Sequence, residues 1–215
     1  MTPLTLCLDT ETSGLVRKGI PLDDMTQPHI VELAARLVDD NDQAVATFCS
    51  IIKPEGWAIE PEAEAIHGIS EARAHKVGMS MALALVVLQA FAYKAGTIVS
   101  FNIEFDRAMI LAEISRAQGL GRWWTRRAQF MYCAMEMSAP IMRIPGLYGD
   151  WKFPTLEGAH AFFYPDVRWE SQHRALDDLD ACLRVWRAIQ RRHADKIGAK
   201  AIRGVASALE VTDGT

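Results

Sequence analysis

The stretch LTLCLDTE, residues 4–11, predicts a buried β-strand that ends in two acids. Residues 4–10 are largely apolar and contain no Gly or Pro, which is typical of a strand inside a sheet. Asp9 and Glu11 lie two positions apart, so both side chains are expected on the same face of the strand. A D-x-E pair is common in protein sequences, and by itself it indicates no function.

The segments that follow predict four more strands. IVELAARLV, residues 30–38, fits a strand or a helix, but the turn-rich DDNDQ and the β-prone AVATFCSIIKP after it favour a hairpin of two strands. TIVSF, residues 97–101, predicts a short buried strand, and FMYCA, residues 130–134, a fifth. Helical patterns occupy 61–73, 80–94, 105–119, part of 152–163 and a long segment from 175. The sequence therefore predicts an α/β fold, with a mixed five-stranded sheet flanked by helices.

Composition and charge restrict the function classes. Half of the 215 residues are hydrophobic and 23% are charged, as in ordinary soluble globular proteins. A net charge of −4 argues against an extended duplex-binding surface, but not against a nucleic-acid enzyme with an acidic, metal-binding site. The four cysteines are widely spaced and form no CxxC pair, which predicts reduced thiols in a cytoplasmic protein and no disulfide or zinc framework.

No membrane association is expected. The first residues, MTPLTLCLDTE, lack the basic-then-apolar pattern of a signal peptide. The apolar run GMSMALALVVLQAFAY, residues 78–93, is shorter than the roughly 20 residues that cross a bilayer. With Ser80 as its N-cap, this run predicts a largely buried helix.

The segment SQHRALDDLDACLRV, residues 171–185, contains three aspartates on one predicted helix. At about 100° per residue, Asp177 and Asp180 lie opposite the apolar side, whereas Asp178 lies at its edge. A carboxylate that points towards a core is costly unless it is paired, protonated or bound to metal. Two interpretations remain for Asp178: an ion-paired or capping residue at the start of the helix, or a metal ligand.

A fourth acid lies where a strand ends and a helix begins, in SFNIEFDRAM, residues 100–109. Asp106 there is either an ordinary helix N-terminal charge or a further metal ligand. Carboxylates from positions 9, 11, 106 and 178 at one sheet edge would repel one another, and Mg²⁺ or Mn²⁺ would relieve that repulsion. Two such ions about 4 Å apart form a clamp for attack at phosphorus.

Three motifs, LDTETSGL, SFNIEFD and HRALDD, occur in the order and spacing of the exonuclease motifs of the DEDDh 3′–5′ exonucleases, which this chain resembles. AIHGIS at 65–70 and CAMEM at 133–137 fit the same family. The resemblance covers roughly residues 4–190 and implies a ribonuclease H-like fold. It also implies a metal-dependent 3′–5′ exonuclease that releases nucleoside 5′-monophosphates, mainly from single-stranded DNA.

The resemblance implies roles for individual residues. The metal-binding carboxylates are Asp9, Glu11, Asp106 and Asp178, and they hold two divalent ions, Mg²⁺ or Mn²⁺. His173 corresponds to the general base, and an imidazole whose ordinary pKa is about 6.5 can take a proton from water at neutral pH. Asp177 and Asp180 are then surface charges. The implied substrate contacts are Thr12, Ser13, Gly14, His67, Asn102 and Phe105.

Several alternatives stay open at this level. Phe105 fits core packing as well as substrate contact, and RWWTRR, residues 122–127, fits either a strand-binding surface or a connection with one tryptophan in the core. The substrate could instead be the 3′ end of an RNA, or the protein could be an inactive subunit of a polymerase or repair complex.

Outside the motifs, the pattern says less. Residues 1–192 are predicted to form the exonuclease domain, with a loop over 16–28 that is longer than in compact family members. Residues 193–215 are predicted to be a C-terminal extension that frays or docks a partner.

Overall fold

Five strands form one mixed sheet, as expected, in the order β3-β2-β1-β4-β5. The computed structural model describes residues 4–21, 24–117, 122–126 and 130–210. Neighbours β1–β2 and β2–β3 are antiparallel, whereas β1–β4 and β4–β5 are parallel. The strands are β1 Leu4–Thr12, β2 Ile30–Val38, β3 Ala44–Ile51, β4 Ala95–Ser100 and β5 Met131–Cys133. The ambiguous segment 30–38 is therefore a strand, the first of the predicted hairpin.

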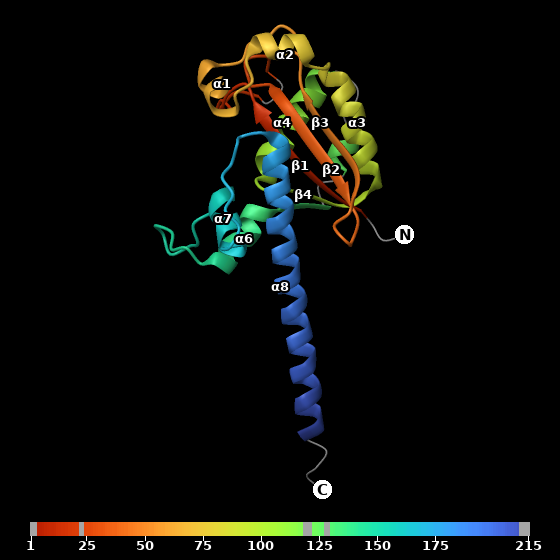
Figure 1. Cartoon of the computed structure of the whole chain (residues 1–215), viewed down its shortest axis with the longest axis vertical. Helices are drawn as coiled ribbons and strands as arrows, with labels where there is room; N and C mark the ends of the chain where they lie inside the picture. The colour runs from red at the N-terminus through yellow and green to blue at the C-terminus, as the bar shows by residue number, and fades with distance from the viewer. Residues whose placement is uncertain (1–3, 22–23, 118–121, 127–129, 211–215) are drawn as a thin grey trace.

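The two faces of the sheet carry different helices, and this positions the acids of β1. Leu6 and Leu8 pack in one core with α3 (Met81–Lys94) and α4 (Ile103–Arg116). Cys7, which points the other way, packs with α8 (Ala175–Glu210), supported by α6 (Ala134–Met142) and α7 (Leu156–Phe163). Side chains alternate along a strand, so Asp9 and Glu11 share the face of Cys7 and point towards the α8 side. Figure 1 shows α8 running along this side of the sheet and far beyond it.

The apolar side predicted for the last helix is its packed side. Leu179, Cys182, Val185, Trp186 and Ile189 are all buried. Asp177 is exposed, as predicted, and the Asp180 side chain is 42% exposed. That side chain is half-buried and forms an ion pair with Arg36 of β2, because the helix packs closely against this strand. The helix also continues to Glu210, so the extension is helical rather than frayed up to that residue; residues 211–215 lie outside the described part.

The segment 61–73 was expected as one helix, but it forms two. α1 (Pro61–His67) ends at Gly68, whose φ of 68° is left-handed and whose N–H donates to the Glu64 carbonyl. α2 (Glu71–Val77) begins after Ser70, whose hydroxyl accepts from the Arg73 N–H. Since glycine adopts a left-handed φ without strain, Gly68 ends the first helix and allows the turn. The sequence also missed α6, which follows β5 directly and contains a proline.

The strand-binding interpretation of RWWTRR is wrong for its tryptophans. Trp123 and Trp124 lie in the short helix α5 (Arg122–Thr125), and both are buried in the core that also contains α3 and α4. Neither indole is available for stacking with a base. Arg127 lies outside the described residues.

Helix α3 is less buried than predicted. Its hydroxyl cap is as expected, with the Ser80 Oγ accepting from the Leu83 N–H. One side packs on the sheet, but Leu83, Val86 and Tyr93 are exposed on the other. Within the described residues, no helix combines the length and the apolar character that crossing a membrane requires.

Candidate active site

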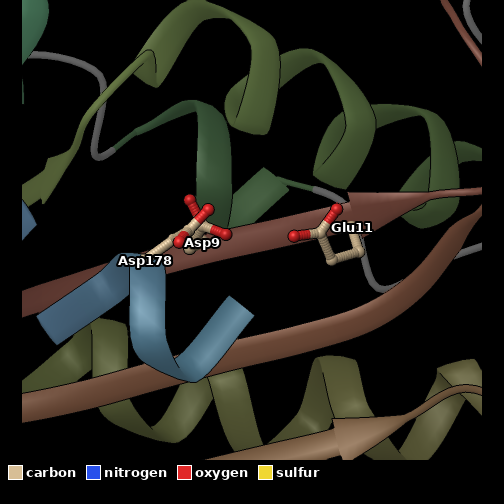
Figure 2. Close-up of side chains that lie close together, drawn as sticks. All are labelled: Asp9, Glu11 and Asp178. Carbon is tan, nitrogen blue, oxygen red and sulfur yellow. The ribbon is translucent and has the colours of Figure 1, made fainter. Parts of the chain in front are cut away.

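Three carboxylates from two elements meet where β1 passes the start of α8. Asp9 and Glu11 come from β1, and Asp178 comes from the first turn of α8. Each offers an oxygen, and these three oxygens lie within 4.8 Å of one another. Figure 2 shows Asp178 reaching the strand beside Asp9, with Glu11 two residues further along. The alternation of β1 and the helical position of Asp178 therefore bring acids 167 or more residues apart into one group.

Asp106 lies next to this group rather than within it. It is buried in the first turn of α4, on the opposite side of the sheet from α8. Its two oxygens are engaged: Thr10 Oγ1 donates to Oδ1 at 2.7 Å, and Ser100 Oγ donates to Oδ2. The sequence predicted a cluster of four carboxylates. Three of them form the group, and the hydroxyls of Thr10 and Ser100 hold the fourth, Asp106, beside Asp9. Thr10 and Ser100 were not singled out from the sequence.

The electrostatics of the group favour a bound cation. Burial first, and then the charge of Asp106, raises the pKa of Asp9 well above its usual value. Burial and then Asp178 raise the pKa of Glu11 to about 8. Burial raises the pKa of Asp106 to about 6, although hydrogen bonds from Ser100 and Thr10 oppose this. Buried like charges destabilise their ionised forms, and hard divalent cations with oxygen ligands remove that penalty.

The segment before α8 anchors Asp178. Burial raises the pKa of Asp178, while the hydrogen bond from Ser171 and the nearby His173 lower it. Ser171 Oγ lies 2.8 and 3.0 Å from the two carboxylate oxygens, and its N–H donates to Glu157 of α7 at 2.9 Å. His173 is exposed, with a left-handed φ of 48°, and its N–H donates to Ser171 Oγ. The candidate base therefore lies at the solvent edge of the acidic group, beside Asp178.

A buried ion pair that sequence reasoning missed ties α8 to the sheet. Glu32 of β2 is 1% exposed and is the register partner of Glu11. Arg174 binds both of its oxygens, with Nε donating to Oε2 at 3.0 Å, and the Ala175 N–H donates to Oε2 at 3.0 Å. This fork-like pairing fixes the first turn of the helix that carries Asp178. The signal in the sequence was a lone glutamate inside the apolar strand IVELAARLV.

A cavity of about 470 Å³ opens beside Glu11. Four of the six predicted substrate contacts line it: Thr12, Gly14, His67 and Phe105. His67 is 3% exposed; its Nδ1 accepts from the Ile69 N–H, and its buried Nε2 has no hydrogen-bond partner among the described residues. Phe105 also packs on the core, so core packing is observed, and contact with a substrate stays a prediction. The cavity is large enough for a ligand of nucleotide size.

The other two predicted contacts occupy different environments. Ser13 is buried, and its Oγ accepts from the His29 N–H at 2.9 Å, which ties β1 to the start of β2. Asn102 is exposed at the residue before α4 and does not line the cavity. The hydroxyl of Ser13 therefore has a structural contact, and Ser13 does not line the cavity.

The loop over 16–28 is pinned at the rim of this cavity. Gln27 donates to the carbonyls of Arg17 and Ile20, at 2.9 and 2.8 Å. Arg116 of α4 donates to the Asp24 carbonyl at 3.1 Å. Arg17 then pairs with Glu60 at 3.1 Å, and both residues line the cavity. Leu22 and Asp23 lie outside the described residues, and of the others in the loop Arg17 lines the cavity.

Comparisons with known proteins bear on the fold. No protein-family model matches the sequence, and no curated protein matches it either. Among solved structures, E. coli exonuclease I in complex with a dT13 oligonucleotide superposes with a TM-score of 0.66 at 18% identity, over 91% of this chain and 43% of that one. Its complex with a dA16 oligonucleotide gives 0.69 at 17% identity, over 92% and 43%.

A second solved protein is closer in length. Exonuclease X in complex with 5′ overhanging duplex DNA superposes with a TM-score of 0.56 at 22% identity, over 87% of this chain and 92% of that one. The chain spans less than half the length of the exonuclease I chains that it matches. At these identities the likeness concerns the arrangement of strands and helices. The chain has the ribonuclease H-like fold of these exonucleases, and its three partly buried acids lie where β1 meets the start of α8.

Proposed function

We propose that the protein is a metal-dependent 3′–5′ exonuclease that hydrolyses the terminal phosphodiester bond of single-stranded DNA and releases nucleoside 5′-monophosphates. The observation that carries the proposal is the group formed by Asp9, Glu11 and Asp178, three carboxylates within 4.8 Å of one another in a fold shared with exonucleases. A protein without a metal-dependent activity gains nothing from such a repulsive, partly buried group, which argues against an inactive subunit.

The carboxylates would hold two divalent ions, Mg²⁺ or Mn²⁺. When bound, such ions polarise the phosphate and lower the pKa of a coordinated water. Asp9, Glu11 and Asp178 supply hard oxygen ligands. Asp106, which Thr10 and Ser100 hold by hydrogen bonds, adds a further negative charge next to Asp9. The Glu32–Arg174 ion pair holds the start of α8 against β2, and the Ser171 hydroxyl holds the Asp178 carboxylate in place.

His173 would act as general base. It lies beside Asp178, close enough for its charge to lower the pKa of that carboxyl, and it is open to solvent. An imidazole at this edge can take the proton of the attacking water and pass it to bulk solvent. Its left-handed backbone turns the chain at this residue, directly before the helix that carries Asp178.

The cavity beside Glu11 would receive the terminal nucleotide. Thr12, Gly14 and His67 form one wall, and the Phe105 ring faces the same space. An aromatic ring and small side chains suit a base and a sugar. The proposed DNA preference is supported by the neighbours, which were solved with dT13 and dA16 oligonucleotides and with duplex DNA.

Digestion of 5′-labelled oligonucleotides tests the proposal. Single-stranded DNA, duplex DNA and RNA of the same sequence are incubated with Mg²⁺, with Mn²⁺ or with EDTA. A ladder that shortens from the 3′ end, requires the metal and forms fastest on single-stranded DNA is expected. Faster cutting of RNA would move the substrate to RNA ends, and no cutting of any strand by the wild-type protein would overturn the proposal.

A further inference from the structure

The segment between α6 and α7, residues 143–153, exposes large apolar side chains at a density seen nowhere else among the described residues. Leu147 and Tyr148 are 93% and 92% exposed, and Phe153 and Trp151 are 54% and 45% exposed. Figure 1 shows the segment looping out beyond both helices. Large apolar side chains that are exposed together lower the solubility of a protein, so such a group marks an interaction site.

The segment is a built hairpin. Pro145 and Trp151 form an antiparallel bridge, the Gly146 N–H donates to the Asp150 carbonyl at 2.9 Å, and the Lys152 N–H donates to the Ile144 carbonyl at 2.9 Å. Gly149 has a left-handed φ of 83° at the tip, and a Cβ on Gly146 would lie 2.9 Å from the Asp150 backbone oxygen. The backbone thus fixes the shape without help from the side chains, which leaves the rings free to make contacts.

Three of the exposed side chains are aromatic, and a cation is next to two of them in the sequence. Tyr148, Trp151 and Phe153 are exposed, and Lys152 lies between the last two in the chain. Arg143 at the base is also exposed, so the hairpin carries two cations against the single anion of Asp150. This is a local excess of positive charge on a protein whose net charge is −4. Exposed aromatic rings with cations nearby suit a single strand, because bases stack on the rings and phosphates attract the cations.

A short covalent path links the hairpin to the candidate active site. Phe153 is followed by buried Pro154 and by Thr155, which caps α7 by accepting from the Gly158 N–H. Glu157 then accepts the Ser171 N–H, and Ser171 bonds Asp178. Glu157 follows Phe153 by four positions, so their Cα atoms lie within about 15 Å of each other. The hairpin is therefore joined directly to α7, which contacts the segment that anchors Asp178.

We infer that the hairpin 143–153 is a second binding site for single-stranded nucleic acid, in which Tyr148 and Trp151 stack on bases upstream of the 3′ end and Arg143 and Lys152 contact phosphates. The inference rests on the proposed function for its choice of partner. The tryptophans of RWWTRR, which the sequence suggested for such a role, are buried, whereas Tyr148, Trp151 and Phe153 of the hairpin are exposed.

Equilibrium binding in EDTA tests the inference without hydrolysis. Fluorescein-labelled dT20 and dT3, together with the matching RNAs, are titrated with the full chain, and anisotropy is recorded. Tyr148→Ala and Trp151→Ala are each expected to weaken binding of the 20-mers by about 5- to 100-fold, the range for loss of one base–aromatic stack. Binding of the trimers, which are too short to reach the hairpin from the acidic group, is expected to change by less than about twofold.

Two control variants separate stacking from general apolar contact. Leu147→Ala removes the most exposed apolar side chain but no ring, and Tyr148→Phe keeps the ring, so both are expected to bind the 20-mers like the wild type. Equal losses of 20-mer binding in Leu147→Ala and Tyr148→Ala would overturn base stacking in favour of general apolar contact. Unchanged binding in both alanine variants of the aromatic residues would overturn it outright.

The outcomes for the two proposals are distinguishable. A wild-type protein that digests strands, combined with alanine variants that bind normally, would remove the hairpin site and leave the exonuclease. A wild-type protein that binds 20-mers through Tyr148 and Trp151 but never cuts them would leave the site and remove the exonuclease. Circular dichroism of each variant checks that the exposed substitutions leave the fold intact.

Discussion

Two carboxylate sites, one buried and one partly buried, lie on opposite sides of the same strands, and they are built in opposite ways. Glu113 of α4, 4% exposed, accepts hydrogen bonds from the Ile30 N–H and from Arg116, each at 3.1 Å, and its Oε1 lies 3.0 Å from His29 Nδ1. Asp9 and Glu11 instead have further carboxylates as their principal charged neighbours. The comparison shows that burial alone does not identify a functional acid; the sign of the charge around it does.

The largest effect is expected from Asp9→Asn. This change removes a carboxylate oxygen from the group that would hold the ions, so we expect turnover to fall by more than about 10³-fold. It also removes a like charge, so the metal-free protein is expected to melt no earlier than the wild type. Digestion rates and melting curves in EDTA measure the two quantities. A variant that keeps near-normal turnover would show that the acidic group is not the site.

His173→Ala is expected to lower turnover by about 10²–10⁴-fold, because the proposed base is lost. Metal affinity is expected to stay close to normal, since the carboxylate ligands remain. Isothermal titration with Mn²⁺ and single-turnover digestion give the two readouts. If the deficit arose mainly from weaker metal binding, His173 would be a ligand and not the base.

Glu113→Gln probes the contrasting site. Breaking a buried ion pair leaves the Arg116 guanidinium, 7% exposed, without its carboxylate, so we expect a loss of about 3 kcal/mol in unfolding free energy. Turnover of the folded protein is expected to be preserved. Urea unfolding and digestion at low temperature provide the measurements. The opposite pattern, stable but inactive, would mean that the two sites have been assigned the wrong way round.

Metal and pH should act together on the acidic group. A folded-state pKa of about 8 for Glu11, against an ordinary value of 4.5, means that the folded protein keeps a proton that the unfolded chain releases. The metal-free protein is therefore expected to lose stability as the pH rises from about 4.5 to about 8, and to change little beyond that through this group.

Bound metal should reverse this loss. Mn²⁺ at 100 times its dissociation constant is expected to add about 2.7 kcal/mol at pH 8, because it binds only the folded, deprotonated site. Thermal melting across this pH range, with EDTA or with Mn²⁺, measures both parts, and Glu11→Gln is the control that should flatten the metal-free curve. Identical melting with and without millimolar Mn²⁺ would count against the two-ion site.

The smallest effects are expected at the other aspartates of α8. Asp177→Asn should be silent, because this carboxylate is exposed. Asp180→Asn should cost about 0.2–1 kcal/mol through its half-exposed ion pair with Arg36, with turnover unchanged. Urea unfolding resolves the difference between them. A collapse of activity in either variant would mean that the wrong aspartate of this helix has been assigned to the site.

Local patterns predicted the framework well. The strand pattern and the two-residue spacing predicted β1 with Asp9 and Glu11 on one face, and the helical pattern singled out Asp178 from its neighbours. These predictions succeed because alternation and helical periodicity are properties of short segments. The single helix expected over 61–73 was wrong at Gly68, where one left-handed residue outweighs a continuous helical pattern.

Contacts between distant segments account for what the sequence missed. Glu32 and Arg174 are separated by 142 positions, Thr10 and Asp106 by 96, and Arg36 and Asp180 by 144. No periodicity signals such pairs, because each partner looks ordinary in its own segment. The same holds for Trp123 and Trp124: an aromatic, basic run looks like a strand-binding surface until the core that surrounds the rings is known.

By itself, the sequence determined the order of the five strands and the directions in which Asp9, Glu11 and Asp178 leave their elements, because backbone geometry converts spacing into direction. Only the tertiary structure decided that these three acids meet while Asp106 is held by two hydroxyls, and that the aromatic side chains of the hairpin 143–153 are exposed. Proximity and exposure depend on how distant segments pack, and packing is a property of the whole chain.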